Sequence, residues 1–345
     1  MSTQTVFRLT QAEGISGLHA TQEPIPTPGP HELLIKIHSI ALNYRDTAIA
    51  TSTYPLPIRD GVVPTSDMAG SVVELGPLVT GFEVGDRVIP PVSASYLYGA
   101  FKEGVDAYGS VEDGMLREYV VLPAHIVVKL PTGAKIGFRE WAAVVCTGAT
   151  VWNAFYGNVA LRPGDTVLLQ GTGGVSITGL VFAKAAGAII IVTSSSDEKL
   201  EKAKALGADY TINYKTHPNW AAEVLRLTNG EGVDHIIENG GLGTIEQSLE
   251  CVAASGVISL IGFLSNAGQQ SQPSILMPAL VKAVVVRGVR GGSKHQLEEV
   301  VRYMGKHELA MPVGKVFGFN REEIVAAFEY VASGKHFGKV CISLD

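Results

Sequence analysis

The chain has 345 residues, enough for about two domains with a hydrophobic core each. Hydrophobic residues make up 46% of it and the net charge is -6, which excludes a disordered protein and argues against a nucleic-acid binder that works by bulk positive charge. The three cysteines, Cys146, Cys251 and Cys341, form no CxxC pair, which fits a reducing compartment. We expect a cytoplasmic protein without a secretory signal or membrane span, because the apolar runs are far shorter than the ~20 residues that a span needs.

The N-terminal third is predicted to be rich in β-strands. Residues 32–42 (ELLIKIHSIAL) combine β-branched side chains with partial alternation of apolar and polar positions. Further short strands are expected at 69–75 and 86–89, each beside a glycine turn signal. Residues 90–114 show no clear period, and we expect a long surface excursion there.

From about residue 150 the pattern changes to strands that alternate with helices. Strands are expected at 166–170, 189–193, 210–213, 235–238, 257–262 and 283–289, and helices at 175–186, 198–206, 220–228 and 244–252. This alternation predicts βαβ units around a parallel sheet. Two more helices (296–306 and 322–333) are followed by a strand at 340–344, which could return to the β-rich N-terminal part.

A glycine-rich turn follows the strand at 166–170 and opens a helix. Its glycines would let the backbone approach a pyrophosphate, whose charge meets the free N–H groups and the positive dipole end of the helix. Ser176 stands where the dinucleotide fingerprint has its third glycine, but the flanking elements favour a cofactor site over an ordinary turn. The predicted contacts in this turn are Gly171, Gly173, Gly174 and Val175.

The end of the next strand selects between NAD and NADP. An NAD site needs a carboxylate there for the ribose 2′-hydroxyl. This chain instead has Ser194 and Ser195, with Lys199 one helical turn further on. Hydroxyls and a cation suit a 2′-phosphate, so the sequence favours NADP(H). The segment from Ser195 to Glu198 also matches a helix capping box, and both readings can hold together.

With these pieces in place, the sequence resembles the medium-chain dehydrogenase/reductase superfamily along essentially its whole length. It looks closest to the zinc-free alcohol-dehydrogenase-like members and the quinone oxidoreductases. The resemblance is carried by residues 43–46 (NYRD), 64–70 (PTSDMAG), 85–88 (GDRV), 171–176 (GTGGVS) and 334–340 (GKHFGKV).

The resemblance implies an α/β protein with two domains. A GroES-like β-barrel domain would comprise residues 1–147 and 290–345, and a Rossmann parallel-sheet domain that binds the dinucleotide would comprise residues 148–289. It further implies a cleft where the nicotinamide meets the substrate, and a homodimer joined through the last Rossmann strand.

Zinc members of the family bind a catalytic ion through Cys, His and a further Cys or Asp. The corresponding positions in this chain hold Asn43 and Ser66, and only Cys146 matches a ligand. Residues 90–114 also lack the four cysteines of the structural zinc lobe. We therefore predict no zinc, and a Cys146 that is a small buried side chain.

The resemblance also assigns roles to single residues. Tyr54 is the predicted proton donor or carbonyl anchor, and Asn43 is predicted to orient the nicotinamide or the substrate. A packed tyrosine ring and a turn asparagine remain the alternatives. An ion pair between Arg45 and Asp46 is expected, with Arg45 also the expected partner of Asp67. Further cofactor contacts are implied for Thr147, Thr150, Tyr214, Asn239, Gly240, Gly262, Phe263, Leu264, Phe337 and Lys339.

The sequence thus predicts a zinc-independent oxidoreductase that transfers hydride from NADPH to a quinone or an α,β-unsaturated carbonyl compound, including enoyl-reductase substrates. Conjugation spreads the charge that a Lewis acid would otherwise stabilise. One alternative is a metal-free alcohol dehydrogenase or carbonyl reductase. Another is an NADPH-binding structural or regulatory protein without turnover.

Overall fold

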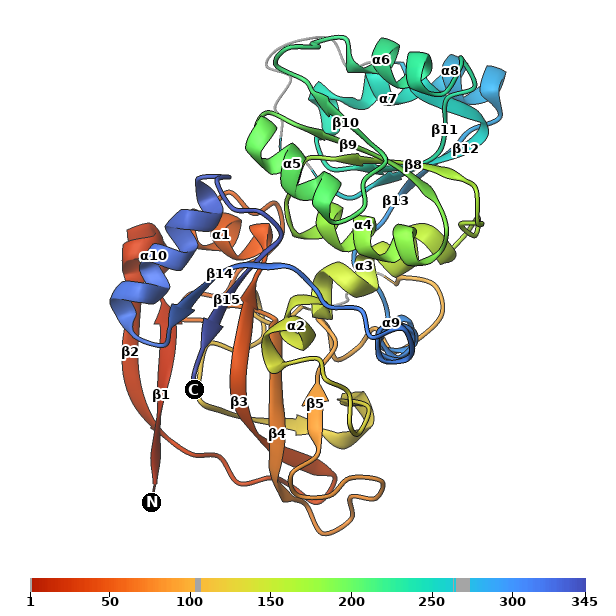
Figure 1. The fold of residues 1–345 in the computed structure, drawn as a ribbon. Coiled ribbons are helices and arrows are strands. Elements are labelled where there is room, and N and C mark those ends of the chain that lie inside the picture. Colours follow the sequence, from red (N-terminus) through yellow and green to blue (C-terminus); the bar gives the residue numbers. More distant parts are fainter. Residues whose placement is uncertain (1, 103–106, 263, 265–273) are drawn as a thin grey trace. The chain divides into compact units, whose positions relative to one another are not determined.

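The computed structural model describes residues 2–102, 107–262, 264 and 274–345 (Figure 1). The chain divides into two compact units. Unit 1 comprises Met1–Ala149 and Gly291–Asp345, and unit 2 comprises Thr150–Arg290. The first border falls within helix α3 (Val145–Tyr156).

Unit 1 is built on a seven-stranded sheet with the order β14-β15-β3-β4-β5-β7, in which β6 also pairs with β3. A separate antiparallel pair, β1 and β2, lies beside the 3₁₀ helix η1. The elements are β1 (Thr3–Leu9), η1 (Gln11–Gly17), β2 (Leu18–Pro24), β3 (Glu32–Leu42), α1 (Tyr44–Ala50), β4 (Asp67–Leu75), β5 (Arg87–Ile89), β6 (Tyr119–Pro123), η2 (Ala124–Ile126), β7 (Val128–Lys129), α2 (Phe138–Ala143), α9 (Lys294–His307), β14 (Val313–Gly318), α10 (Arg321–Ala332) and β15 (Lys339–Ser343).

The C-terminal strand β15 completes the sheet of unit 1. It pairs antiparallel with β3, and Val340 lies opposite Leu42. This confirms that a strand near 340–344 returns to the N-terminal part. Apolar side chains of β3 such as Ile35, Ile37 and Ile40 are fully buried in the core of the unit.

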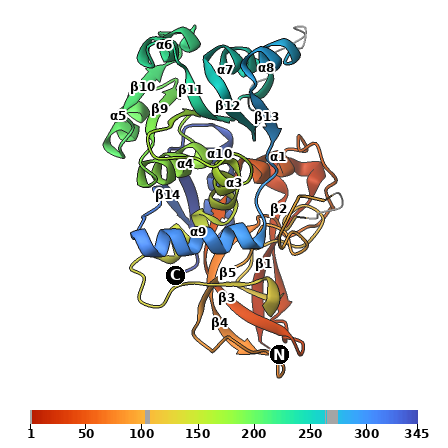
Figure 2. The same cartoon turned by 90° about the vertical axis from the view of Figure 1, so that its right-hand side faces the viewer.

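Unit 2 is a parallel sheet with the strand order β10-β9-β8-β11-β12-β13, which is that of the Rossmann fold. Helices α4 and α5 cover one face, and α6, α7 and α8 cover the other (Figure 1, Figure 2). The elements are β8 (Thr166–Gln170), α4 (Gly174–Ala185), β9 (Ile189–Ser194), α5 (Asp197–Ala205), β10 (Tyr210–Asn213), α6 (Trp220–Leu227), β11 (Val233–Glu238), η3 (Gly241–Gly243), α7 (Ile245–Cys251), β12 (Val252–Leu260), α8 (Leu276–Lys282) and β13 (Val285–Gly288).

The expected surface excursion at 90–114 is wrong in one respect. Its described residues form no helix and only one isolated strand bridge, as expected for a loop. However, Tyr96 and Tyr108 are only 8% and 9% exposed, and Tyr108 belongs to the core of unit 1. Tyr96 and Tyr108 therefore anchor the segment to the unit, because large apolar rings gain most from leaving water, while Tyr98 is 77% exposed at the surface.

Among the described residues, no helix is both long and apolar enough to cross a lipid bilayer.

Candidate active site

A cluster of buried polar side chains lies where three strands of unit 1 meet. Asn43 directly follows β3, Lys339 begins β15 and Asp67 begins β4. The antiparallel register places Val340 opposite Leu42 and Asp67 opposite Ala41, which brings the three residues together. The Lys339 ammonium Nζ donates to Asn43 Oδ1 at 2.6 Å and to Asp67 Oδ2 at 3.4 Å.

The Asp67 carboxylate is fully buried and held from several sides. Ser66 Oγ donates to its Oδ1 at 2.7 Å, and the backbone N–H of Cys146 donates to its Oδ2 at 3.1 Å. The expected pairing of Asp67 with Arg45 was wrong. The partner is Lys339, because β15 rather than α1 supplies the nearest cation.

Arg45 and Asp46 form the expected ion pair, with Nη1 and Oδ1 separated by 3.7 Å. Asp46 also accepts the backbone N–H of Asn43 at 2.8 Å. Burial raises the pKa of the Asp46 carboxyl to about 6, against the opposing effect of the Arg45 charge. Thr65, which precedes Ser66 and Asp67 in the chain, has a positive φ of 70°, a strained conformation for a β-branched residue.

These residues do not fit a zinc ion. Cys146 is the one residue at a family ligand position that could bind zinc, and burial together with the Asp67 carboxylate raises the pKa of its thiol to about 12. The other donors are an amide, a hydroxyl and a carboxylate that already binds an ammonium group. Across the described residues, no group of three or more His, Cys, Asp or Glu side chains could hold a metal ion. Zinc independence stays a prediction, which this donor set supports.

Tyr54 is half-buried, and its ring packs against the core of unit 1. The Arg45 guanidinium carbon lies 5.4 Å from the ring centroid, within cation–π range. The structure therefore contains the packed ring of the alternative interpretation, and the proton-donor role stays a prediction.

The glycine turn of unit 2 has the backbone that phosphate binding needs. Gly171 has a positive φ of 79°, and an added Cβ there would meet open space. Gly173 is the N-cap of the twelve-residue helix α4, and as a glycine it has no side chain that could accept from the first N–H groups of the helix. Gly174 and Val175 form the first turn of α4. The turn fits a dinucleotide pyrophosphate.

Ser176, in the place of the third glycine, has a structural role. Its Oγ donates to Gln170 O at 2.7 Å and accepts from Asn239 Nδ2 at 3.0 Å. The serine therefore ties together the carboxyl ends of β8 and β11, the edge at which such sheets bind ligands.

The region predicted to choose the cofactor lies at the end of β9. Ser194 is its last residue and is buried, while Ser195 and Lys199 are half-buried. Burial lowers the pKa of the Lys199 ammonium, although Glu198 opposes this. The predicted capping box starting at Ser195 was wrong. Ser196 is the N-cap of α5, and its side chain accepts the backbone N–H of Lys199, because the strand runs one residue further than expected.

The other predicted cofactor residues lie on both units. Tyr214 N donates to Ser194 O, and Leu264 N donates to Asn239 O. A Cβ on Gly262 would lie 2.3 Å from Asn239 O, so this close approach requires glycine. Phe263 lies outside the described residues. In unit 1, Thr147 Oγ1 donates to Ala143 O, and Phe337 is half-buried two residues before Lys339. In unit 2, Thr150 is the first residue, and Gly240 lies just after β11.

A buried carboxylate that was not predicted from the sequence, Glu238, lies at the end of β11. Its Oε1 accepts from Gly240 N, Gly241 N and Thr244 Oγ1 at 2.9, 3.0 and 2.5 Å. Its Oε2 accepts from Gln170 Nε2 at 2.6 Å and Ser248 Oγ at 2.5 Å. The network fixes the loop after β11 beside the end of β8. The sequence held one signal for this network: Gln170 and Glu238 are polar residues that end β8 and β11, two neighbouring strands of the sheet.

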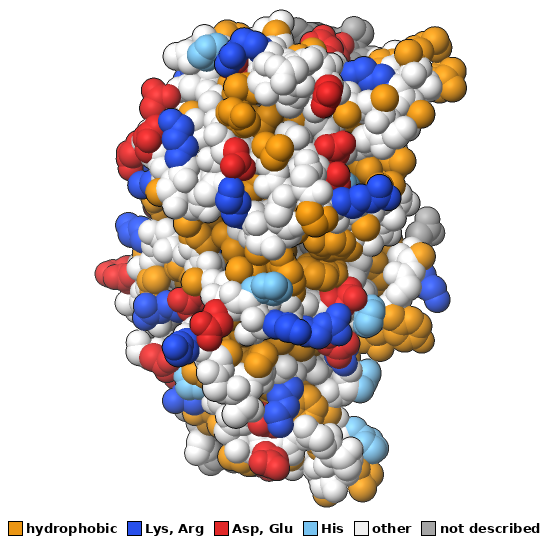
Figure 3. Space-filling model, turned by 45° about the vertical axis from the view of Figure 1, so that its right-hand side comes forward, with side chains coloured by type: hydrophobic (Ala, Val, Ile, Leu, Met, Phe, Trp, Pro, Cys, Tyr) orange, Lys and Arg blue, Asp and Glu red, His pale blue; other side chains and the backbone are white. Residues whose placement is uncertain are grey.

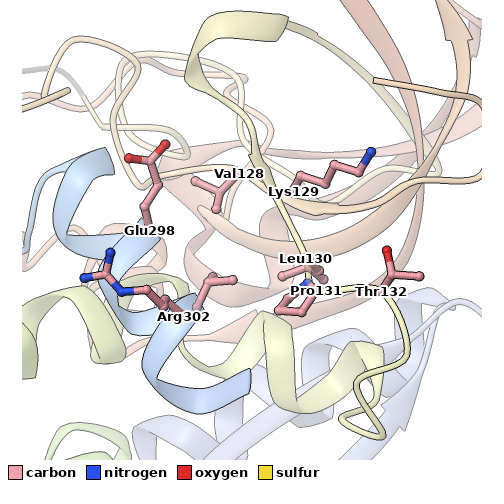
Figure 4. A pocket seen from close by; sticks show the side chains of 8 residues that line it. Val128, Lys129, Leu130, Pro131, Thr132, Glu298 and Arg302 are labelled. Carbon is pink, nitrogen blue, oxygen red and sulfur yellow. The ribbon is translucent and has the colours of Figure 1, made fainter. Parts of the chain in front are cut away.

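A surface pocket of unit 1 lies between residues 128–132 and helix α9, which contributes Glu298 and Arg302 (Figure 4). None of the predicted site residues lines it. Its walls are aliphatic stems and exposed charges, so it does not resemble a site for hydride transfer.

Fold and site together define a two-unit oxidoreductase with a dinucleotide-binding unit and a polar cluster in the other unit. Known proteins agree. Residues 29–132 match the alcohol dehydrogenase GroES-like domain, and residues 174–306 match the zinc-binding dehydrogenase family. A zinc-type alcohol dehydrogenase-like protein of Schizosaccharomyces pombe is 41% identical over 341 residues, which covers 97% of each chain.

A quinone oxidoreductase of Pseudomonas aeruginosa is 36% identical over 241 residues, 69% of this chain and 67% of that protein. The crystal structure of an NAD-dependent alcohol dehydrogenase has a TM-score of 0.88 and 29% identity, covering 99% of this chain and 100% of that one. The chain belongs to the medium-chain dehydrogenase/reductase superfamily and is an oxidoreductase of the alcohol dehydrogenase and quinone oxidoreductase type.

Proposed function

We propose that the protein is an NADPH-dependent reductase of quinones or α,β-unsaturated carbonyl compounds that works without zinc. The observation that carries the proposal is the Lys339 cluster, in which an ammonium group binds the Asp67 carboxylate. Reduction builds negative charge on the acceptor oxygen, which zinc would stabilise as a Lewis acid. In a site without zinc, hydrogen-bond donors must do this, and conjugated acceptors need the least help because they delocalise the charge.

Asn43 Nδ2 suits the role of that donor. It is buried and has no hydrogen-bond partner within the described part of the chain. A buried donor without a partner costs about 1–3 kcal/mol, which an acceptor oxygen of the substrate would recover. When bound, NADPH supplies the hydride to the β-carbon of an enone. The Tyr54 hydroxyl gives a proton to the resulting enolate and regains one from solvent.

NADPH is proposed over NADH because no carboxylate stands at the end of β9. Ser194 and Ser195 offer hydroxyl groups there, and Lys199 offers a cation. Together these groups suit a 2′-phosphate. Kinship does not decide between the cofactors, since a related structure is NAD-dependent.

The test is a panel of quinones, enones, saturated ketones and secondary alcohols, followed by the absorbance of NADPH and, in parallel, NADH. We expect oxidation of NADPH with quinones or enones. Turnover of saturated ketones alone would instead identify a carbonyl reductase. Stabilisation by NADPH without any turnover would identify a non-catalytic binding protein, and would overturn the proposal.

Substitution of Tyr54 tests the proposed proton donor. We expect Tyr54→Phe to lower kcat about 100-fold and to leave NADPH binding unchanged, because only the hydroxyl is lost. Tyr98→Phe is the matched control, since Tyr98 is 77% exposed. An unchanged kcat in Tyr54→Phe would show that the ring only packs.

We also propose a homodimer. Strand β13 ends the order of the unit 2 sheet, so its outer edge offers unpaired backbone groups. Beside it, α8 exposes a row of apolar side chains, Leu276, Met277, Leu280 and Val281. Hydrophobic side chains gather at the upper right of Figure 3, where α8 lies. A second copy paired along β13 would cover both features.

A cytoplasmic location is proposed on the state of the cysteines. No disulfide joins Cys251 or Cys341, and both are buried. Cysteines outside disulfides fit a reducing compartment.

A further inference from the structure

Lys339 is a buried lysine whose closest partner is not a carboxylate. Its side chain is almost fully buried, and Nζ lies 0.8 Å closer to the neutral Asn43 Oδ1 (2.6 Å) than to Asp67 Oδ2 (3.4 Å). Taking an ammonium out of water costs several kcal/mol, so its hydrogen bonds have to be good ones. The short contact to the amide oxygen is therefore a principal interaction of this cation.

The charges of the cluster balance without Asn43. Two cations, Lys339 and Arg45, lie among two carboxylates, Asp46 and Asp67. Neutralising Asp67 would require only the lysine, so charge balance does not explain why an asparagine stands beside the ammonium.

The lysine does settle which way the Asn43 carboxamide points. An ammonium group has three donors and no acceptor, so only the amide oxygen can face it. Rotating the amide by half a turn would set Nδ2 against Nζ, donor against donor. The Nδ2 group is consequently held away from Lys339, where it has no partner among the described residues.

We propose that Lys339 is a positioning residue that locks the Asn43 carboxamide so that Nδ2 donates to the carbonyl oxygen of the acceptor. This inference rests on the proposed function and names the residue that makes the donor reliable. Without the lysine, the amide loses its contact to the ammonium group and is held only by the backbone N–H of Asp46 in the capping box of α1, so its oxygen can face the developing oxyanion part of the time. The loss then falls on the transition state, since a misdirected oxygen repels that charge.

The experiment is a double-mutant cycle of Lys339→Met and Asn43→Ala, with Lys335→Met as the matched control. Lys335 is exposed and lies four residues before Lys339 in the same segment. The readouts are kcat and KM for an enone, the NADPH dissociation constant, and the infrared carbonyl stretch of a bound ketone that is not turned over. We expect each single variant to lower kcat about 100-fold. NADPH affinity should stay within about threefold, and the carbonyl downshift of the wild type should disappear.

The effects of Lys339→Met and Asn43→Ala on kcat should be coupled. In the Asn43→Ala background, Lys339→Met should lower kcat less than about threefold further, because the lysine acts through the asparagine. A further loss as large as in the single variant would overturn the proposal, as would a Lys339→Met enzyme with unchanged kcat. If Lys339→Met does not fold, Asn43→Asp decides: it keeps an acceptor for the lysine but lacks the donor, and a kcat near that of the wild type refutes the inference. A wild type without any NADPH-dependent activity would instead refute the proposed function.

Discussion

The Glu238 network of unit 2 allows a stability prediction to be worked out atom by atom. Replacing Glu238 by Gln keeps the shape and exchanges one acceptor oxygen for an NH₂ group. The new oxygen would take the Oε1 side, where it keeps the N–H groups of Gly240 and Gly241. The new NH₂ group then faces Gln170 Nε2, which is itself a donor. The Gln170 amide is held in this orientation because its Oε1 accepts from Asn239 N and Gly240 N.

The magnitude follows from these contacts. The hydrogen bond from Gln170 Nε2 to the carboxylate is lost, and the remaining bonds lose the carboxylate charge. Gln170 Nε2 still donates to Ser248 Oγ at 2.9 Å, so it is not left unsatisfied. Hydrogen bonds to charged groups contribute about 1.5–3 kcal/mol, and we expect Glu238→Gln to lower the free energy of unfolding by about that amount.

Urea unfolding followed by tryptophan fluorescence measures this loss, since Trp152 and Trp220 both belong to unit 2. Glu231→Gln is the matched control, because Glu231 is exposed two residues before β11. A Glu238→Gln protein within about 0.5 kcal/mol of the wild type would show that the carboxylate does not hold the loop, and the reasoning would fail.

Three further predictions concern the cofactor, the response to pH and assembly. Ser194→Asp should weaken NADPH binding about 10- to 100-fold while sparing NADH, because a carboxylate repels the 2′-phosphate; equal loss of both cofactors in binding titrations would contradict this. Burial lowers the pKa of His235 below its unfolded value of 6.5, so its neutral form is the stable one. The wild type should therefore lose stability as pH falls below about 6.5, and a His235→Asn variant, measured by urea unfolding at each pH, should lose less. Leu280→Glu together with Val281→Glu should convert the proposed dimer to a monomer in light scattering, and an unchanged mass would exclude that interface.

Much of unit 2 could be predicted from the sequence because its signals are local. The strands β8 and β10 have the expected bounds, and the glycines at 187 and 207 follow the ends of α4 and α5 closely. Each of these helices ends before a glycine with positive φ, which is a local stop signal. The helices α3 and α8 were not predicted. The first contains two Thr, two Val and one Gly, residues of weak helix propensity, and tertiary packing overrides that preference.

The site of unit 1 could be predicted only in part. The family positions point to Asn43 and Asp67, but nothing in the sequence predicts that Lys339 binds both; the cofactor contact predicted for Lys339 stays a prediction. Asn43 and Lys339 are separated by 296 positions in the chain, and only the pairing of β3 with β15 brings them together. A register between distant strands has no local signature. The lysine at the start of a strand expected to return to the N-terminal part was the one available hint.

The pairing of β15 with β3 also bears on how the protein is made. Unit 2 is one unbroken stretch of chain and can fold as soon as it leaves the ribosome. Strand β3 is synthesised far earlier, and its residues 39–42 lack their neighbour until β15 emerges, so this part of its edge stays open in the meantime. A cell must keep that part of the edge from pairing with other chains, and a message cut short before codon 339 would leave it without its partner strand.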